Sequence, residues 1–194
     1  MTYRFSTVSQ VALLVAVILH LVAACTPTDN SSSPGLLKSN SVASTYVELS
    51  RRYLERGNMA AAFENAQKAV AADPESVEGH TLMGLILQGR GDSDNAARHY
   101  LKAKKLAPYD PFVSNAYGTY LCSNGLYGEA DSEFLAASKS PLNQYPWVAL
   151  TNAGLCYERY GQYDLARARL QSALALNSDF SQADQAMKRL RGRG

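Results

Sequence analysis

The feature that most constrains the fold of this 194-residue chain is a repeat of 34 residues. Gly57, Gly91 and Gly125 lie 34 positions apart, and Gly161 follows after 36. Three further series of small residues keep this spacing in phase with the glycines. A fixed period of this length indicates stacked copies of one supersecondary unit, because such a unit cannot bury its apolar face alone. The further series are Ala62, Ala96, Ala130 and Ala166; Ala69, Ala103, Ala137 and Ala173; and Gly84, Gly118 and Gly154, with Ser50 in the first copy.

Each unit has two stretches with apolar residues at helical spacing, such as Leu82, Leu85 and Ile86. The glycine between the stretches tolerates positive φ and ends the first helix, and Pro74 and Pro108 stop the second helix. The pattern resembles the tetratricopeptide repeat, which implies an all-α, right-handed superhelix of helix-turn-helix units. We expect four repeats at about 43–76, 77–110, 111–146 and 147–178, followed by a capping helix and basic tail at 179–194.

The first segment is typical of a targeting signal. One charged side chain, Arg4, precedes an apolar run of 14 residues at 11–24, which is too short to span a bilayer because spanning takes about 20 residues. The run ends in Val-Ala-Ala before Cys25, which resembles a bacterial lipobox. This resemblance implies that a lipoprotein signal peptide, residues 1–24, is removed and that Cys25 carries acyl chains, palmitate among them. The alternative is an ordinary signal peptide with a coincidental cysteine.

Residues 25–42 are predicted to be the lipidated N-terminus and a flexible tether, because they are rich in Ser, Pro, Asn and Gly and have no period. Thr26 stands where the lipoprotein pattern has Asp in proteins kept at the inner membrane. Each buried CH₂ of an acyl chain stabilises membrane attachment by about 0.8 kcal/mol. We therefore expect a protein lipid-anchored to the outer membrane, with its repeats facing the periplasm.

The composition argues against several classes of function. Nineteen Lys and Arg against 17 Asp and Glu give a formal charge of +2, which gives no support to nucleic-acid binding. We find no phosphate-binding loop, no nucleophile elbow and no His, Cys and carboxylate set with metal-ligand spacing. His80 and His99 lie on different predicted helices and are expected to be packed or surface residues. We predict no catalytic residue, no metal, no cofactor and no small-molecule substrate, and thus a protein-binding protein.

The third and fourth units resemble one family more specifically. The residues concerned are Asn-Ala-Tyr-Gly-Thr-Tyr-Leu-Cys at 115–122, Gly-Leu-Tyr at 125–127, the longer junction at 140–146, and Asn-Ala-Gly-Leu-Cys at 152–156. They are similar to the type IV pilus pilotin family, also called pilus biogenesis/stability proteins, which are outer-membrane lipoproteins with tetratricopeptide repeats. Ala116 replaces one Asn of the family's usual Asn-Asn pair.

This resemblance implies a non-enzymatic adaptor. A pilotin promotes the outer-membrane localisation and multimerisation of the secretin, the ring through which the pilus leaves the cell, so the secretin subunit is the expected partner. The alternative is a tetratricopeptide-repeat lipoprotein that serves another outer-membrane or cell-wall machine, either β-barrel assembly or the control of peptidoglycan synthases.

A disulfide is predicted between Cys122 and Cys156. If Cys25 is acylated, these are the remaining thiols, and the periplasm is oxidising. Both lie late in the first helix of their units, and equivalent helices of adjacent repeats are side by side, so a bridge is sterically possible. The alternative is a pair of buried free thiols.

The partner site is expected in the inner groove, on the first helix of each unit. Val47, Leu54 and Leu85 are predicted to form an exposed apolar patch for the apolar face of a client helix. The alternative is that Leu54 and Leu85 pack between repeats. Polar groove residues would orient the client or pair with its backbone. The full set of groove predictions is Val47, Arg51, Leu54, Glu55, Thr81, Leu85, Gln88, Asn115, Thr119, Thr151, Leu155 and Glu158.

Overall fold

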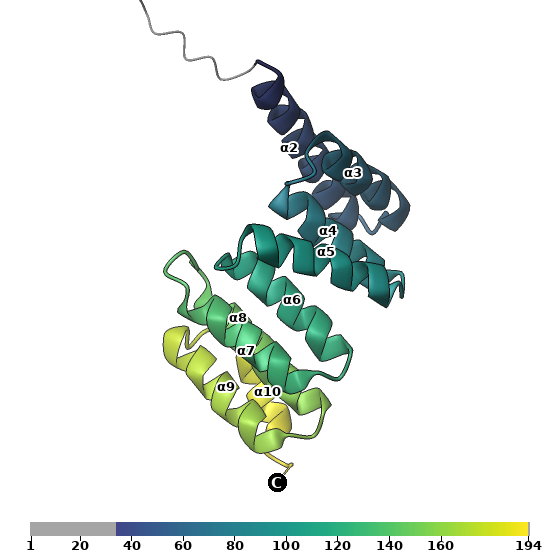
Figure 1. Ribbon diagram of the computed structural model, residues 1–194. Coiled ribbons are helices and arrows are strands. Elements are labelled where there is room, and N and C mark those ends of the chain that lie inside the picture. The colour runs from purple at the N-terminus through teal and green to yellow at the C-terminus, as the bar shows by residue number, and fades with distance from the viewer. Residues whose placement is uncertain (1–33, 194) are drawn as a thin grey trace, which may run out of the picture. The chain divides into compact units, whose positions relative to one another are not determined.

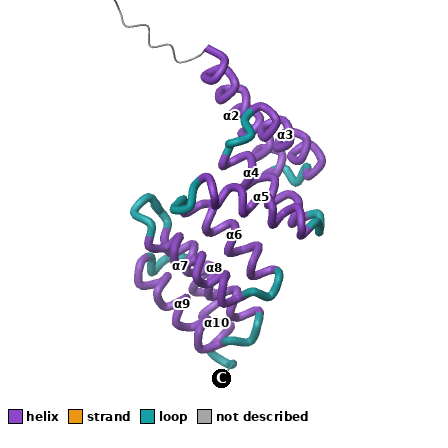
Figure 2. Tube along the Cα trace, in the orientation of Figure 1, coloured by secondary structure: helices purple, strands orange, loops and turns teal. Residues whose placement is uncertain are grey.

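The computed structural model describes residues 34–193, and every regular element within them is an α-helix. From Leu37 onward the chain forms one unit, in which successive helices pair and each pair packs on the next (Figure 1 and Figure 2). The fold is the predicted all-α tetratricopeptide-repeat superhelix. The helices are α2 (Pro34–Glu55), α3 (Met59–Ala72), α4 (Val77–Gly89), α5 (Ser93–Leu106), α6 (Pro111–Ser123), α7 (Tyr127–Lys139), α8 (Pro146–Arg159), α9 (Tyr163–Leu176) and α10 (Ser181–Leu190).

The periodic glycines form the turns within the four helix pairs. Gly57, Gly91, Gly125 and Gly161 have φ values of 73°, 80°, 81° and 71°. A residue with a Cβ is strained in this left-handed region, whereas glycine adopts it freely. The 34-residue series therefore marks four copies of the same turn, as predicted.

The glycines in the middle of the first helices let the second helix of each pair approach closely. A Cβ added at Gly84, Gly118 or Gly154 would lie 2.9, 2.9 or 2.6 Å from a ring or branch carbon of the facing helix. Glycine inside a helix costs about 1 kcal/mol relative to alanine, so its recurrence here is explained by packing. The facing side chains, all buried, are Tyr100, Phe134 and Leu170 in the same order.

The first helix of the first repeat begins earlier than predicted. α2 starts at Pro34, so residues 34–42, which the sequence predicts to be tether, are helical. Proline is favoured at the first position of a helix, and residues 36–42 contain no glycine or proline that would interrupt one. The prediction of a flexible tether is therefore wrong for this stretch. Cys25 and the predicted signal peptide lie outside the described residues.

The C-terminal helix α10 covers the last repeat, as predicted. It buries Ala183, Ala186 and Leu190 against the fourth helix pair. Toward the same helix pair, Arg189 donates from Nε and Nη2 to the Glu158 carboxylate of α8, over 2.9 and 2.7 Å. A helix with one apolar and one polar face can thus end the repeat stack.

Candidate partner-binding groove

Two adjoining pockets lie mainly along the first helices of the repeats. The apolar pocket has a volume of about 580 Å³, and the polar pocket one of about 270 Å³. Gln88 and Ser123 line both, so the pockets form one continuous groove across α4, α6 and α8. The apolar pocket is lined by Leu54, Met59, Leu85, Gln88, Gly89, Gly91, Ser93, Ser123 and Asn124, and the polar pocket by Gln88, Thr119, Cys122, Ser123, Phe134, Asn152, Leu155, Cys156 and Arg159.

One predicted groove position is wrong. Val47, Thr81 and Thr151 are equivalent in their units, and they are 4%, 1% and 0% exposed. The two threonine hydroxyls donate to the carbonyls of Val77 and Trp147 one turn earlier, at 2.8 Å each, so they are satisfied inside the stack. In these three units the position packs between helices instead of facing the groove, so the predicted apolar patch loses Val47. In the third unit the same position holds Asn115, which is partly exposed.

The charged residues predicted for the groove are also engaged or lie elsewhere. Arg51 forms ion pairs with Glu48 and Glu78, so its guanidinium already has carboxylate partners. Glu158 forms an ion pair with Arg189 of the capping helix. The hydrogen bonds from Arg189, and then its positive charge, lower the pKa of Glu158. Glu55 is exposed but lines neither pocket. The orienting role predicted for Arg51 is therefore not supported by its contacts.

The other predicted groove residues lie in the pockets, with one exception. Leu54 and Leu85 line the apolar pocket; Leu85 is 42% exposed, whereas Leu54 is half-buried and also packs on the core. Packing between repeats therefore describes Leu54 in part, but not Leu85. Thr119 and Leu155 line the polar pocket. Asn115 instead lines a separate pocket beside the junction at 140–146.

Gln88 connects the two pockets and is held in one orientation. The buried Tyr100 hydroxyl donates to Gln88 Oε1 at 3.0 Å, and Gln88 Nε2 donates to Ser123 Oγ at 3.0 Å. Burial raises the pKa of Tyr100, so its hydroxyl stays protonated and remains a donor. The carbonyl oxygen of Gln88 is thereby occupied, while its second N–H is left for a ligand acceptor.

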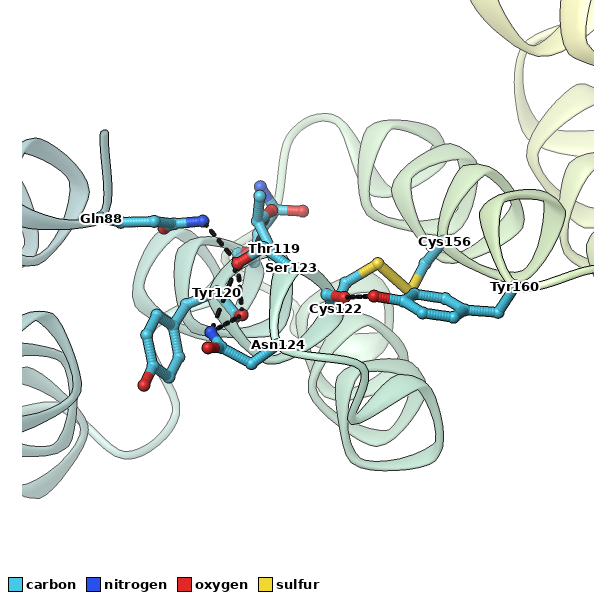
Figure 3. Close-up of a disulfide and its surroundings, with 9 residues drawn as sticks. Gln88, Thr119, Tyr120, Cys122, Ser123, Asn124, Cys156 and Tyr160 are labelled. Carbon is cyan, nitrogen blue, oxygen red and sulfur yellow. Dashed lines mark hydrogen bonds between the residues drawn. A yellow bond between two sulfur atoms is a disulfide. The ribbon is translucent and has the colours of Figure 1, made fainter. Parts of the chain in front are cut away.

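A disulfide joins Cys122 and Cys156, as predicted, with 5.8 Å between their Cα atoms (Figure 3). Both cysteines line the polar pocket. Beside them the Tyr160 hydroxyl donates to the Cys122 carbonyl oxygen at 2.7 Å. The bridge therefore fixes α6 to α8 near the C-terminal ends of both helices, away from the junction at 140–146.

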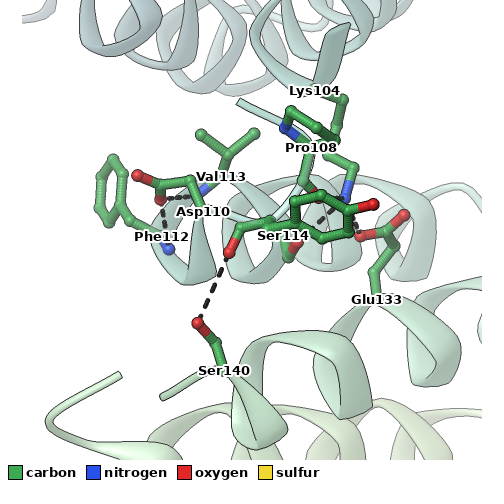
Figure 4. A network of polar contacts seen from close by, with 9 residues as sticks. Lys104, Pro108, Asp110, Phe112, Val113, Ser114, Glu133 and Ser140 are labelled. Carbon is green, nitrogen blue, oxygen red and sulfur yellow. Dashed lines mark hydrogen bonds and ion pairs between the residues drawn. The ribbon is translucent and has the colours of Figure 1, made fainter. Parts of the chain in front are cut away.

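The turn between α5 and α6, which joins the second repeat to the third, is ordered by a polar network around Lys104 (Figure 4). Its Nζ donates to the Pro108 carbonyl oxygen, to Ser114 Oγ and to the Glu133 carboxylate, over 2.9–3.1 Å. Asp110 caps α6 by accepting from two backbone N–H groups of its first turn. One lysine thus links α5, α6 and α7, so the repeats on both sides of α6 hold fixed positions.

Several pocket residues were not predicted from the sequence. Gly89, Ser123 and Arg159 occupy the same repeat position as Glu55, at spacings of 34, 34 and 36 residues. Carrying the Glu55 offset through all four units would have found them. Asn152, whose Nδ2 donates to Asn115 Oδ1 at 3.0 Å, adjoins a predicted position but follows no period.

The histidines lie outside the groove. His80 Nδ1 and His99 Nδ1 share a hydrogen bond of 2.9 Å, and His80 Nε2 lies 3.1 Å from the Pro74 carbonyl oxygen. In residues 34–193 no group of three or more His, Cys, Asp or Glu residues is placed to hold a metal ion. Over the same residues, no helix is both long enough and apolar enough to cross a membrane.

The chain resembles known proteins in sequence. No protein-family model matches it. Curated proteins that are similar include an uncharacterized protein of Haemophilus influenzae, 28% identical over 158 residues that cover 81% of this chain and 87% of that protein. They also include the type IV pilus assembly protein PilF of Pseudomonas aeruginosa, 29% identical over 132 residues. That match covers 68% of this chain but only 52% of PilF.

Solved structures similar to the chain include PilF again. PilW, a widely conserved type IV pilus biogenesis factor, has a TM-score of 0.72 and 25% identity, and the match covers 78% of this chain and 70% of PilW. Pseudomonas aeruginosa PilF has a TM-score of 0.72 and 26% identity, and the match covers 79% of this chain and 69% of PilF. YrrB, a tetratricopeptide-repeat protein with an unusual peptide-binding site, shares the fold with a TM-score of 0.61 and 24% identity. That match covers 76% of this chain and 75% of YrrB. The chain is thus similar in sequence and in fold to tetratricopeptide-repeat proteins of type IV pilus biogenesis.

Proposed function

We propose that this protein is a non-enzymatic adaptor of type IV pilus biogenesis, and more narrowly a pilotin that delivers secretin subunits to the outer membrane and promotes their multimerisation. The observation that carries the proposal is the likeness to PilW and PilF, at a TM-score of 0.72 over 78% and 79% of the chain. Two other tetratricopeptide-repeat proteins that share the fold, one from Thermus thermophilus and YrrB, reach 0.66 and 0.61. The TM-scores of the pilus proteins are higher, and PilF is also similar in sequence.

In this proposal Cys25 carries the lipid, and the repeats face the periplasm from the outer membrane. The disulfide supports an oxidising compartment, since structural disulfides persist there and are rare in the cytosol. The lipobox supplies the anchor, and the groove supplies the partner site.

The groove suits a client that inserts an apolar side chain. Leu54, Met59 and Leu85 surround the apolar pocket, and its volume of about 580 Å³ lies within the usual range of ligand pockets. No acidic side chain lines either pocket in the described part of the chain. Burying apolar surface contributes about 25 cal/mol per Å², so an apolar anchor is the natural source of affinity here.

The test is complementation of a gene deletion, with secretin multimers and twitching motility as readouts. The combined change Leu54→Asp and Leu85→Asp should abolish multimers while the protein stays helical and membrane-bound, because two carboxylates would occupy the apolar pocket. Leu101→Asp with Leu176→Asp is the matched control, since both leucines are more than half exposed and line neither pocket. Full multimer formation by the folded pocket variant would refute the groove as the secretin site.

The deletion itself tests the wider function. Loss of secretin multimers and twitching is expected, and Cys25→Ala should leave unlipidated protein away from the outer membrane, as mass spectrometry of the N-terminus would show. Normal pili together with defects in β-barrel assembly or cell-wall synthesis would favour an adaptor of another machine.

A further inference from the structure

The groove has a different chemical character at each end. Its α2 and α4 end is apolar, through Leu54, Met59 and Leu85, and its α8 end carries Arg159. Arg159 is the one charged side chain among the described residues that line the two pockets. The groove is therefore polarised along its length, from an apolar end to a cationic end.

The Arg159 guanidinium has no partner among the described residues. It is exposed, and it makes no ion pair or hydrogen bond with them. The adjacent carboxylate, Glu158, is already bound in bidentate fashion by Arg189. A guanidinium on the rim of a pocket presents donors in a planar fork that matches a carboxylate.

The stretch between the two ends offers hydrogen-bonding groups suited to an extended backbone. Gln88 has a free N–H, because its other groups bind Tyr100 and Ser123. Thr119 donates to its own helix, which leaves its oxygen as an acceptor. The side-chain amide nitrogen of Asn152 donates to Asn115, and the side-chain oxygen of Asn152 accepts from no described residue.

From this arrangement we propose that the groove binds an extended segment of its protein partner that carries a large apolar side chain at one end and an Asp or Glu side chain at the other. The apolar side chain enters the pocket at Leu54 and Leu85, and the carboxylate pairs with Arg159. The inference rests on the groove being the partner site of the proposed function, and it specifies the chemistry of that partner.

The spacing of the two recognition elements follows from helix packing. Leu85 lies on α4 and Arg159 on α8, with α6 between them. Packed helices are about 8–10 Å apart, so the two ends are separated by roughly 16–20 Å. An extended chain advances about 3.3 Å per residue. The apolar and acidic residues of the segment should therefore be about five or six positions apart.

Selection from a random dodecapeptide library, displayed with its C-terminus fused to the carrier, tests the proposal on the purified full-length protein. The fusion removes free terminal carboxylates, so any acid selected is a side chain. Selected sequences should combine Leu, Ile, Met or Phe with Asp or Glu about five or six positions away. With Arg159→Gln the acidic preference should vanish while the apolar preference remains; Lys105→Gln, an exposed cation outside the groove, should change neither.

A selected peptide, synthesised with a fluorophore, then gives the magnitude. Replacing its acidic residue by Gln should weaken binding to the native protein about two- to fivefold and leave binding to Arg159→Gln unchanged. The proposal is overturned if no peptide is enriched, if the acidic preference survives Arg159→Gln, or if acids are selected only at a free C-terminus in a library that presents one. This assay contains no secretin, so its result is independent of the test of the pilotin function. The peptide preference can be found even if secretin assembly does not depend on the protein, and it can be absent even if secretin assembly does.

Discussion

Gly154→Ala would test whether close packing explains the glycines inside the first helices. Alanine is favoured over glycine in a helix by about 1 kcal/mol, which alone would stabilise the protein. The added Cβ, however, would lie 2.6 Å from Cγ and 2.9 Å from Cδ2 of Leu170, and 3.2 Å from the Ala166 carbonyl oxygen. Leu170 is fully buried, and its Cγ is a branch point that cannot swing away. Overpacking of this kind costs about 1–3 kcal/mol.

We expect the clash to outweigh the helix propensity, so that Gly154→Ala lowers the free energy of unfolding by up to about 2 kcal/mol. Urea denaturation of the full chain, followed by circular dichroism, would measure it. Gly128→Ala in α7 is the matched control, because outside its own stretch of helix nothing lies within 4 Å of the added Cβ; it should stabilise the protein by up to about 1 kcal/mol.

A double-mutant cycle isolates the contact. Leu170→Ala alone should cost about 2–5 kcal/mol, but it removes the atoms that clash. In that background Gly154→Ala should become neutral or stabilising, which gives a favourable coupling energy between the two changes. If Gly154→Ala stabilises the native protein as much as Gly128→Ala does, the close-packing explanation is wrong.

Three further predictions concern stability. Reducing the disulfide should lower the free energy of unfolding by about 3–4 kcal/mol, because it closes a 34-residue loop; an unchanged urea midpoint with reductant would contradict this. Asp131→Ala should lower the free energy of unfolding by about 2–3 kcal/mol in the same assay, since it leaves the partly buried Arg169 guanidinium unpaired. The control Asp164→Ala, at a 95% exposed carboxylate, should lower it by under about 0.5 kcal/mol, and equal costs would refute the reasoning. Desolvation, then the neighbouring His80, lowers the pKa of His99, so the unfolded chain binds this proton more readily. The contribution of neutral His99 to the free energy of unfolding is complete above about pH 6.5, and it is lost as the pH falls through the lowered pKa of the folded state. His99→Gln should therefore reduce the difference in the free energy of unfolding between about pH 7.5 and about pH 5.5.

The fold could be predicted because its determinants are local and repeated. Each turn needs positive φ at one position, and each helix pair needs a small residue where the helices touch, so both requirements appear in the sequence as glycine at a fixed spacing. The start of α2 could not be predicted in the same way. Residues 34–42 carry no periodic apolar pattern, and the proline that suggests a tether is also a favoured first residue of a helix.

The groove could be predicted only in part, because an α-helix does not present a straight stripe of positions spaced by four. Residues four apart are offset by about 40° around the helix, since each residue turns it by about 100°. The position of Thr81 therefore points into the stack, while Leu85, one step later, faces the pocket, and Gly89, a further step on, lies at its far edge. A set of offsets chosen from the whole helix mixes buried and exposed positions.

Arg159 was missed for a reason that bears on function. The position that it shares with Glu55, Gly89 and Ser123 holds a different residue type in every unit, so the period gives the position but not the residue type found there. Packing positions repeat because every unit must satisfy the same contact with its neighbour. A groove position meets a different part of the partner in each unit, and so it is under no pressure to repeat. Arg159, whose guanidinium is unpaired among the described residues, stands at such a position and gives the groove its direction. The place to look for specificity in a repeat protein is therefore where the period fails on an exposed face of the first helices.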